Sequence, residues 1–260
     1  MTLYDIKVLD DKISKELREE VWEYLKDQPW YCWVRKSRQL KRFVPRVDGY
    51  DFPLKQEKAI YGVTMPRTLF AVDEPDLREH HPVIYRLWNE INSALNNDYE
   101  INGIREDSAT DWFPELFPEF KARDGGRGHR AYVNAQPKEW VKRSHGIHRD
   151  NINLEDDTKK TILYFANPEW YPSWFAENIF YSEDPEETTG DHQQHQNVTG
   201  ISQNRGFKVG WPEKIVSPKP GRILAYDSRS LHTTRPASEW CPDDVMRLAV
   251  AFRAQKKACL

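Results

Sequence analysis

Short apolar segments separated by turn residues fill the second half of this chain, and they constrain its fold more than any other feature. The segments are rich in β-branched and aromatic residues, and no helical pattern lies between them, which favours antiparallel pairing over a parallel sheet. Expected strands cover residues 131–133, 161–165, 178–181, 222–226 and 248–252. They predict a mainly β fold built as an antiparallel sandwich with flanking helices.

The first half is expected to supply the flanking helices. Residues 4–9 alternate like a short strand, and Ser14 is a common type of N-cap for the helix that follows. A second helix is expected from Pro82, with apolar residues at i+4 steps until it ends at 96–98. We interpret the chain as a single domain, with a helix-rich support region over 1–122 and a β core over 123–260.

Composition excludes several classes of function. Lys and Arg number 38 against 41 Asp and Glu, a net charge of −3, so no nucleic-acid signature stands out. The three cysteines, Cys32, Cys241 and Cys259, form no CxxC pair, which favours reduced thiols in a cytoplasmic protein. No apolar run is long enough to span a bilayer, so no membrane association is expected. Oligomeric state leaves no signal in the sequence.

A His-x-Asp tripeptide is the most informative motif for chemistry. On a strand, His148 and Asp150 point to one face while Arg149 points to the other. His232 follows the expected strand at 222–226 and is the candidate for a third ligand. Two histidines and one carboxylate on one face of an octahedron are typical of non-haem Fe(II) oxygenases, and the opposite face stays open for a 2-oxo acid and O2. Alone, the tripeptide is a weak signal, since a solvated histidine beside a surface Asp is the common case.

Arg247 makes the combination more specific. It lies fifteen residues after His232 and opens the last expected strand. A guanidinium at this position could bind the distal carboxylate of 2-oxoglutarate through two parallel hydrogen bonds.

With these residues in place, the chain resembles the prolyl 4-hydroxylase-like branch of the Fe(II)/2-oxoglutarate-dependent dioxygenases. The resemblance runs from Ala131 to Phe252, through HRD at 148–150, TILYFANPEW at 161–170, PGRILAYDSRSLH at 220–232 and RLAVAF at 247–252. It implies a double-stranded β-helix, or jelly-roll, core. It also implies Fe(II), 2-oxoglutarate and O2, with ascorbate as a further candidate cofactor.

The resemblance implies roles for individual residues. His148, Asp150 and His232 would be the catalytic metal ligands, and Arg247 would anchor the co-substrate. Tyr164 lies where the family often has a residue that helps to hold 2-oxoglutarate, although Thr161 or Phe165 could face the pocket instead. Tyr132 is a similar candidate on the preceding strand. The implied reaction is hydroxylation of a C–H bond, in a prolyl residue or an amino-acid-like small molecule.

The sequence also departs from the family pattern. Phe175-Ala176-Glu177 stands where many relatives have Gly-Gly-Glu, and residues 184–216 form a long polar stretch that we interpret as a lid or an insertion. Position 150 keeps its carboxylate, which halogenating relatives lose, so hydroxylation is favoured. Desaturation, cyclisation or demethylation at the same iron remains an alternative. A non-catalytic jelly-roll binding or sensor module is another.

Other features have simpler interpretations. His145, His192 and His195 are expected to be solvated rather than metal ligands, and His80 and His81 to cap a helix. Solvated surface is likewise the interpretation of the basic stretch 35–46 and of the Gly-rich loop 123–130. For four residues near the expected site, packing is the commoner role and a place in the substrate cleft is the alternative: Asn167, Trp170, Trp174 and Trp211.

Overall fold

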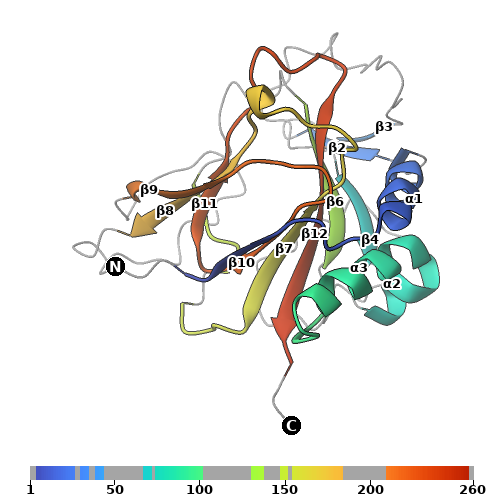
Figure 1. The fold of residues 1–260 in the computed structure, drawn as a ribbon, viewed down its shortest axis with the longest axis horizontal. Helices are drawn as coiled ribbons and strands as arrows, with labels where there is room; N and C mark the ends of the chain where they lie inside the picture. The colour runs from blue at the N-terminus through green and yellow to red at the C-terminus, as the bar shows by residue number, and fades with distance from the viewer. Residues whose placement is uncertain are drawn as a thin grey trace.

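Two antiparallel sheets form the body of the protein (Figure 1). The computed structural model describes residues 4–26, 30–34, 39–43, 67–71, 74–101, 130–137, 147–151, 154–183 and 209–257. Within these residues the larger sheet has nine strands in the order β1-β10-β7-β12-β6-β4-β2-β3, and β5 also pairs with β12. Their bounds are β1 Ile6–Leu9, β2 Trp30–Val34, β3 Gln39–Phe43, β4 Arg67–Ala71, β5 Tyr99–Glu100, β6 Ala131–Pro137, β7 Lys159–Phe165, β10 Ile223–Asp227 and β12 Met246–Lys256.

The smaller sheet has the order β11-β8-β9. These strands are β8 Asn178–Glu183, β9 Val209–Val216 and β11 Leu231–Thr234. On the free side of β11, His148 and His232 form an isolated antiparallel bridge, which adds a fourth short segment to this sheet. The segment that carries the His-x-Asp motif is therefore a single bridge, where the sequence suggested a strand.

The chain alternates between the two sheets, and this alternation defines the fold. It runs from β6 to the bridge at His148, back to β7, across to β8 and β9, back to β10, across to β11 and back to β12. Two sheets between which the chain alternates in this way form a double-stranded β-helix, or jelly roll. The predicted fold class is confirmed.

In the described part of the chain, three helices cover the outer face of the larger sheet (Figure 1). They are α1 Lys15–Lys26, α2 Glu74–His80 and α3 Pro82–Ala94, and a short 3-10 helix spans Pro172–Trp174. Helix α1 buries Leu17, Val21 and Leu25 against this sheet, as its apolar spacing predicts. Each such side chain stabilises the fold by about 2 kcal/mol. The Ser14 hydroxyl donates to Glu90 in α3, so this residue links two helices.

Strand β12 separates the two layers of the core. Met246, Leu248, Val250 and Phe252 pack toward the helices, whereas Ala249 and Ala251 belong to the cluster between the sheets. Because side chains alternate along a strand, Arg247 and Arg253 share the inner face with the two alanines. Both ends of the barrel interior therefore receive an arginine from the same strand.

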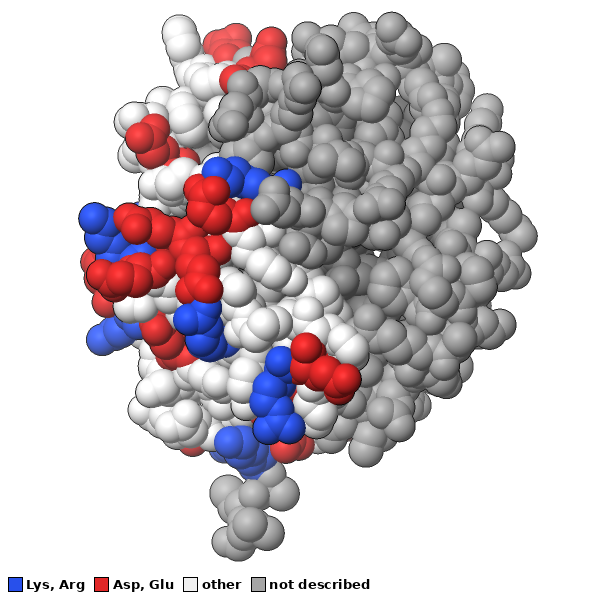
Figure 2. Space-filling view, turned by 90° about the vertical axis from the view of Figure 1, so that its right-hand side faces the viewer, with Lys and Arg blue, Asp and Glu red and all other residues white. Residues whose placement is uncertain are grey.

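Some strands were not expected from the sequence. β2, β3 and β4 extend the larger sheet from residues between the two predicted helices, where no strand was predicted. β9 lies in the stretch interpreted as a lid or an insertion. The rest of that stretch, 184–208, lies outside the described residues, as do most of 35–46 and 123–129. Figure 2 shows the face that carries the helices, where acidic side chains gather and basic ones are scattered. None of the described helices has the length and hydropathy needed to cross a membrane.

Candidate metal centre

The barrel brings the three predicted ligands together from distant parts of the chain. His148 and His232 face each other across the bridge, with backbone hydrogen bonds of 3.0 and 2.9 Å in the two directions. The amide of Asp150 donates to the carbonyl of Ser228 at 2.9 Å, which fixes the motif against the β10–β11 turn. Backbone pairing, and not only side-chain contact, therefore sets the geometry of the cluster.

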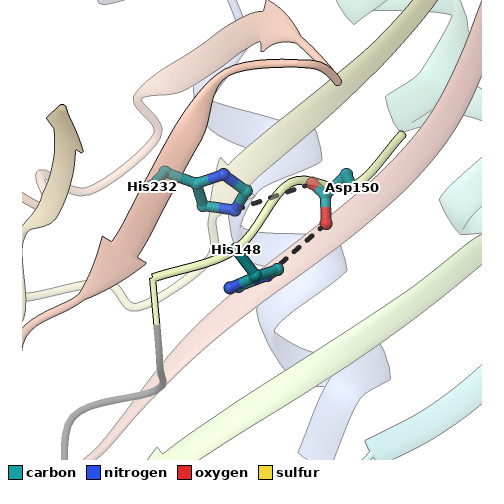
Figure 3. A group of neighbouring side chains, drawn as sticks. All are labelled: His148, Asp150 and His232. Atoms are coloured by element: carbon teal, nitrogen blue, oxygen red, sulfur yellow. Dashed lines mark ion pairs between the residues drawn. The ribbon is translucent and has the colours of Figure 1, made fainter. Parts of the chain in front are cut away.

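Each imidazole faces a different oxygen of the Asp150 carboxylate (Figure 3). His148 Nε2 lies 3.6 Å from Oδ1, and His232 Nε2 lies 3.7 Å from Oδ2. The three donor atoms all lie within 4.8 Å of one another. The side chains of Asp150 and His232 are 4% and 5% exposed, whereas that of His148 is 47% exposed, so solvent reaches the cluster from the His148 side.

His232 is held in the tautomer that a metal ligand requires. Its Nδ1 lies 2.9 Å from the carbonyl of Ser230, and because a carbonyl only accepts, Nδ1 carries the proton. The lone pair of Nε2 therefore points into the cluster, where the Tyr226 hydroxyl lies 3.2 Å away. Burial lowers the pKa of His232 to about 4, so the ring is neutral at physiological pH. A backbone partner on the other ring nitrogen is the usual support of a metal-ligating histidine.

Asp150 is ionised and held by several donors. Oδ2 accepts from Thr161 at 2.7 Å and from Tyr226 at 3.0 Å. Arg253 Nη2 donates to Oδ1 at 2.7 Å, and its Nη1 forms an ion pair with Oδ2 at 2.5 Å. Burial is the largest effect and raises the pKa of this carboxyl, but Arg253 and the two neighbouring histidines together outweigh it and hold the pKa well below its usual range.

The donor set fits a first-row divalent ion. Two neutral imidazoles and one carboxylate are the ligands of the facial Fe(II) site. Among the described residues they form the cluster of histidine, cysteine and acidic side chains able to hold a metal. His145, His192 and His195 lie outside the described residues. His81 makes no side-chain cap, and its Nδ1 lies 2.6 Å from the hydroxyl of Tyr24.

Arg247 lies in the barrel interior and is 3% exposed. Its Nη1 donates to Gln136 at 3.1 Å, its Nη2 donates to Asn178, and the guanidinium lies 4.9 Å from the centre of the Phe165 ring. Its buried Nε has no hydrogen-bond partner among the described residues. Burial lowers the pKa of Arg247 to about 10. The protein thus holds a buried cation with neutral amide groups.

The other three candidates for the co-substrate lie in different places. Thr161 is on the inner face of β7, where its hydroxyl donates to the Asp150 carboxylate, a member of the cluster. Tyr132 also faces inward, and its hydroxyl accepts from Arg253 Nε at 3.1 Å. Tyr164 points to the opposite face of β7, into the core beneath the helices, so the structure does not bring it to the cluster.

The four residues named as alternatives for the substrate cleft bond the backbone, pack in the core or lie at the surface. Asn167 bonds the backbone of Met246 and Leu248 at 2.7 Å each and ties the end of β7 to β12. Trp170 packs in a small cluster with Ala176, and Trp174 lies against it. Trp211 is 83% exposed on β9.

Sequence reasoning missed Arg253 and Tyr226, which both contact the carboxylate of Asp150. Period-two alternation on β12 could have found Arg253, because it shares a face with Arg247 and the two alanines. Tyr226 shares the inner face of β10 with Leu224, two residues earlier, and could have been found in the same way.

No family model and no curated protein matches this chain. Among solved structures, a prolyl hydroxylase of Trichoplax adhaerens, in complex with a hypoxia inducible factor oxygen degradation domain peptide fragment, is 16% identical. That match covers 96% of this chain and 83% of that one, with a TM-score of 0.46. A prolyl-4-hydroxylase of Pseudomonas putida is 10% identical over 98% of this chain and 94% of its own, with a TM-score of 0.43.

An Fe(II)/α-ketoglutarate-dependent dioxygenase, TqaL, is 8% identical over 94% of this chain and 75% of its own, with a TM-score of 0.34. The solved neighbours thus include prolyl hydroxylases and Fe(II)-dependent dioxygenases, at low identity and modest TM-scores. Any inference about the chemistry of this chain must therefore come from its own side chains.

Proposed function

We propose that this protein is an Fe(II)- and 2-oxoglutarate-dependent dioxygenase that hydroxylates a C–H bond. The observation that carries the proposal is the cluster of His148, Asp150 and His232, with neutral imidazole, ionised carboxylate and a tautomer fixed by the Ser230 carbonyl. Such a set binds one face of an octahedral ion and leaves the other positions for substrates.

Arg247 supports the second part of the proposal, the co-substrate. A buried guanidinium that is satisfied only by amide oxygens, and whose Nε lacks a partner among the described residues, favours an anionic ligand. Ala249 and Ala251 are the small residues that separate it from Arg253 along the inner face of β12. A dicarboxylate in the barrel would have one end at the metal ligands and the other at Arg247. Tyr132 could line its path, whereas Thr161 acts through Asp150.

Iron and 2-oxoglutarate, when bound, supply an oxidative decarboxylation with O2 that yields succinate and CO2 and inserts one oxygen atom into the substrate C–H bond. The chain supplies the three ligands, the cation for the distal carboxylate and a cluster in which the side chains of Asp150 and His232 are buried. Exposed His148 marks the side from which substrate can approach.

A prolyl residue in a peptide, or an amino-acid-like small molecule, is the proposed substrate class, and it rests on the sequence resemblance. Desaturation, cyclisation or demethylation would use the same ligands and is the alternative outcome. A cytoplasmic location and a possible need for ascorbate, both expected from the sequence, belong to the same proposal.

Succinate formation tests the reaction class. Protein purified without oxygen is mixed with Fe(II) and 2-oxoglutarate, O2 is admitted, and succinate is measured with and without candidate peptides and amino acids. Wild type should form succinate in an iron-dependent reaction, slowly in the absence of the prime substrate. His148→Ala should abolish the reaction, and Arg247→Ala should raise the 2-oxoglutarate concentration required.

The matched control is His81→Ala, which removes a histidine far from the cluster and should leave succinate formation intact. If wild type forms no succinate and shows no absorbance change when Fe(II) and 2-oxoglutarate are added without oxygen, the chemistry is excluded. A non-catalytic binding module would then be favoured.

A further inference from the structure

Arg253 contacts both oxygens of the Asp150 carboxylate. It is not one of the three proposed metal ligands. Its guanidinium donates to Oδ1 of Asp150 and forms an ion pair with Oδ2. It also donates to the Thr161 hydroxyl at 2.6 Å, and its Nε donates to Tyr132 at 3.1 Å. Its side chain is 26% exposed, whereas that of Asp150 is 4% exposed. A cation that remains in contact with water is thus paired with a buried ligand carboxylate.

We propose that Arg253 is a built-in counter-charge that lowers the affinity of the site for divalent cations and makes tight metal binding depend on an anionic co-ligand. The inference rests on the proposed metal site and goes beyond it, because it assigns control of metal affinity to a residue that is not a ligand.

The charges of the cluster give the physical reason. His148 and His232 contribute no charge when neutral, so Asp150 supplies the single negative charge and Arg253 cancels it. A cation bound through Asp150 must therefore lie close to the guanidinium that shares the same carboxylate. Because Asp150 and His232 are buried, their surroundings screen this repulsion less than water does.

The orientation of Asp150 does not depend on Arg253 alone. Thr161 and Tyr226 both donate to Oδ2, and the Asp150 backbone is bonded to Ser228. Oδ1 faces His148 and is the oxygen with fewer donors around it. Removal of Arg253 therefore changes the charge of the site more than the aim of its carboxylate. Arg253 is therefore a counter-charge and not a residue that positions Asp150.

A consequence for ligand binding follows from the same charges. With Arg253 present, a divalent ion gives the cluster a net charge of +2, which anionic ligands in the open positions would reduce. The affinity for metal and the affinity for a 2-oxo acid should therefore reinforce each other, by equal factors in both directions. Without Arg253 the loaded cluster is less positive, and this mutual reinforcement should be weaker.

Titration with Co(II), which reports ligand binding in its visible spectrum, tests the inference without turnover. Wild type, Arg253→Met, Arg253→Gln and Arg253→Lys are titrated by calorimetry and absorbance, with and without 2-oxoglutarate. The neutral variants should bind Co(II) tighter by about tenfold or more, because a neighbouring cation is removed. Gln retains a donor for Asp150 if Met impairs folding. Lys retains the charge and should bind within a few-fold of wild type.

Arg222→Met is the matched control, because Arg222 pairs with both oxygens of Asp10 at 2.7 and 2.8 Å and is not part of the cluster. It should leave Co(II) affinity unchanged. Weaker or unchanged Co(II) binding in both neutral variants would overturn the counter-charge role, while Co(II) binding by wild type would leave the proposed function intact. If neither wild type nor any Arg253 variant binds Co(II), both proposals fail. If only the neutral variants bind, the counter-charge role is supported.

Discussion

Strand β12 directs two arginines into the barrel, and their surroundings differ in charge. Arg253 is paired with the carboxylate of Asp150 and remains partly exposed. Arg247 is almost fully buried and is held by the amide oxygens of Gln136 and Asn178. A folded protein pairs a buried charge or leaves it to be paired by a ligand. Under the proposed function, Arg253 would pair with a ligand carboxylate and Arg247 would bind an anionic co-substrate.

The largest expected effect is at the shared carboxylate. Asp150→Asn keeps the shape of the side chain and removes its charge. Because the charged oxygen ligand is lost, the affinity for Co(II) should fall by more than about 100-fold. Co(II) titration of this variant measures the change, with Asp10→Asn as the control. Co(II) affinity within a few-fold of wild type would remove Asp150 from the metal site.

The second effect separates the two arginines by their ligands. Arg247→Met should weaken 2-oxoglutarate binding on the order of 100-fold, because a buried charge-assisted pair is lost. Arg253→Met should weaken 2-oxoglutarate binding far less, because Arg253 does not contact the distal carboxylate in the proposed arrangement. Calorimetric titration of 2-oxoglutarate into Co(II)-loaded variants makes the comparison. If Arg247→Met binds like wild type, the anchor lies elsewhere in the barrel.

The third effect separates the same variants by stability. Arg253→Met leaves Asp150 as a buried charge without its counter-ion, which should lower the free energy of unfolding by about 2 kcal/mol after allowance for solvent exposure. Arg247→Met removes a buried cation that is hydrogen-bonded by neutral amide groups, and it should change the free energy of unfolding by less than about 1 kcal/mol. Urea unfolding of the metal-free variants gives both values. Equal losses would contradict the difference in charge balance.

The smallest effect concerns an ion pair at the surface. Arg222 donates to Asp10, and this hydrogen bond, which outweighs a smaller opposing effect of burial, lowers the pKa of Asp10 to about 2. Because the pKa is depressed in the folded state, its stabilisation is complete above about pH 4 and is lost as the pH falls toward 2. Asp10→Asn should flatten this part of the stability profile by at most about 1 kcal/mol. An unchanged acid profile would show that the pair contributes nothing.

The close approach of His148, Asp150 and His232 could be predicted from the sequence, because it depends on short-range pattern and on fold class. His148 and Asp150 are two residues apart, and His232 follows a strand that a jelly roll places beside them. Tyr164 was the weakest expectation, since alternation on β7 places Thr161 and Phe165 on the inner face and Tyr164 on the outer one.

Other features could not be predicted from local pattern. The strands β2, β3 and β4 exist because β6 offers an edge for pairing, which is a long-range property. Phe175 and Ala176 take the positive φ angles of 58° and 65° in place of the expected glycines. The Phe175 ring lies 3.9 Å from the Arg235 guanidinium, a contact that glycine could not make. Tertiary contacts thus stabilise a backbone that local preference disfavours.

The most direct test of the site is an anaerobic titration of Fe(II)-loaded protein with 2-oxoglutarate, followed by its visible charge-transfer absorption. Wild type should develop the band with one equivalent of each ligand. Loss of His232 to Ala should abolish the band, and Arg247→Met should shift its midpoint to much higher 2-oxoglutarate concentration at unchanged intensity. The absence of the band in wild type, or an Arg247→Met titration that superimposes on wild type, would contradict the proposed roles of these residues.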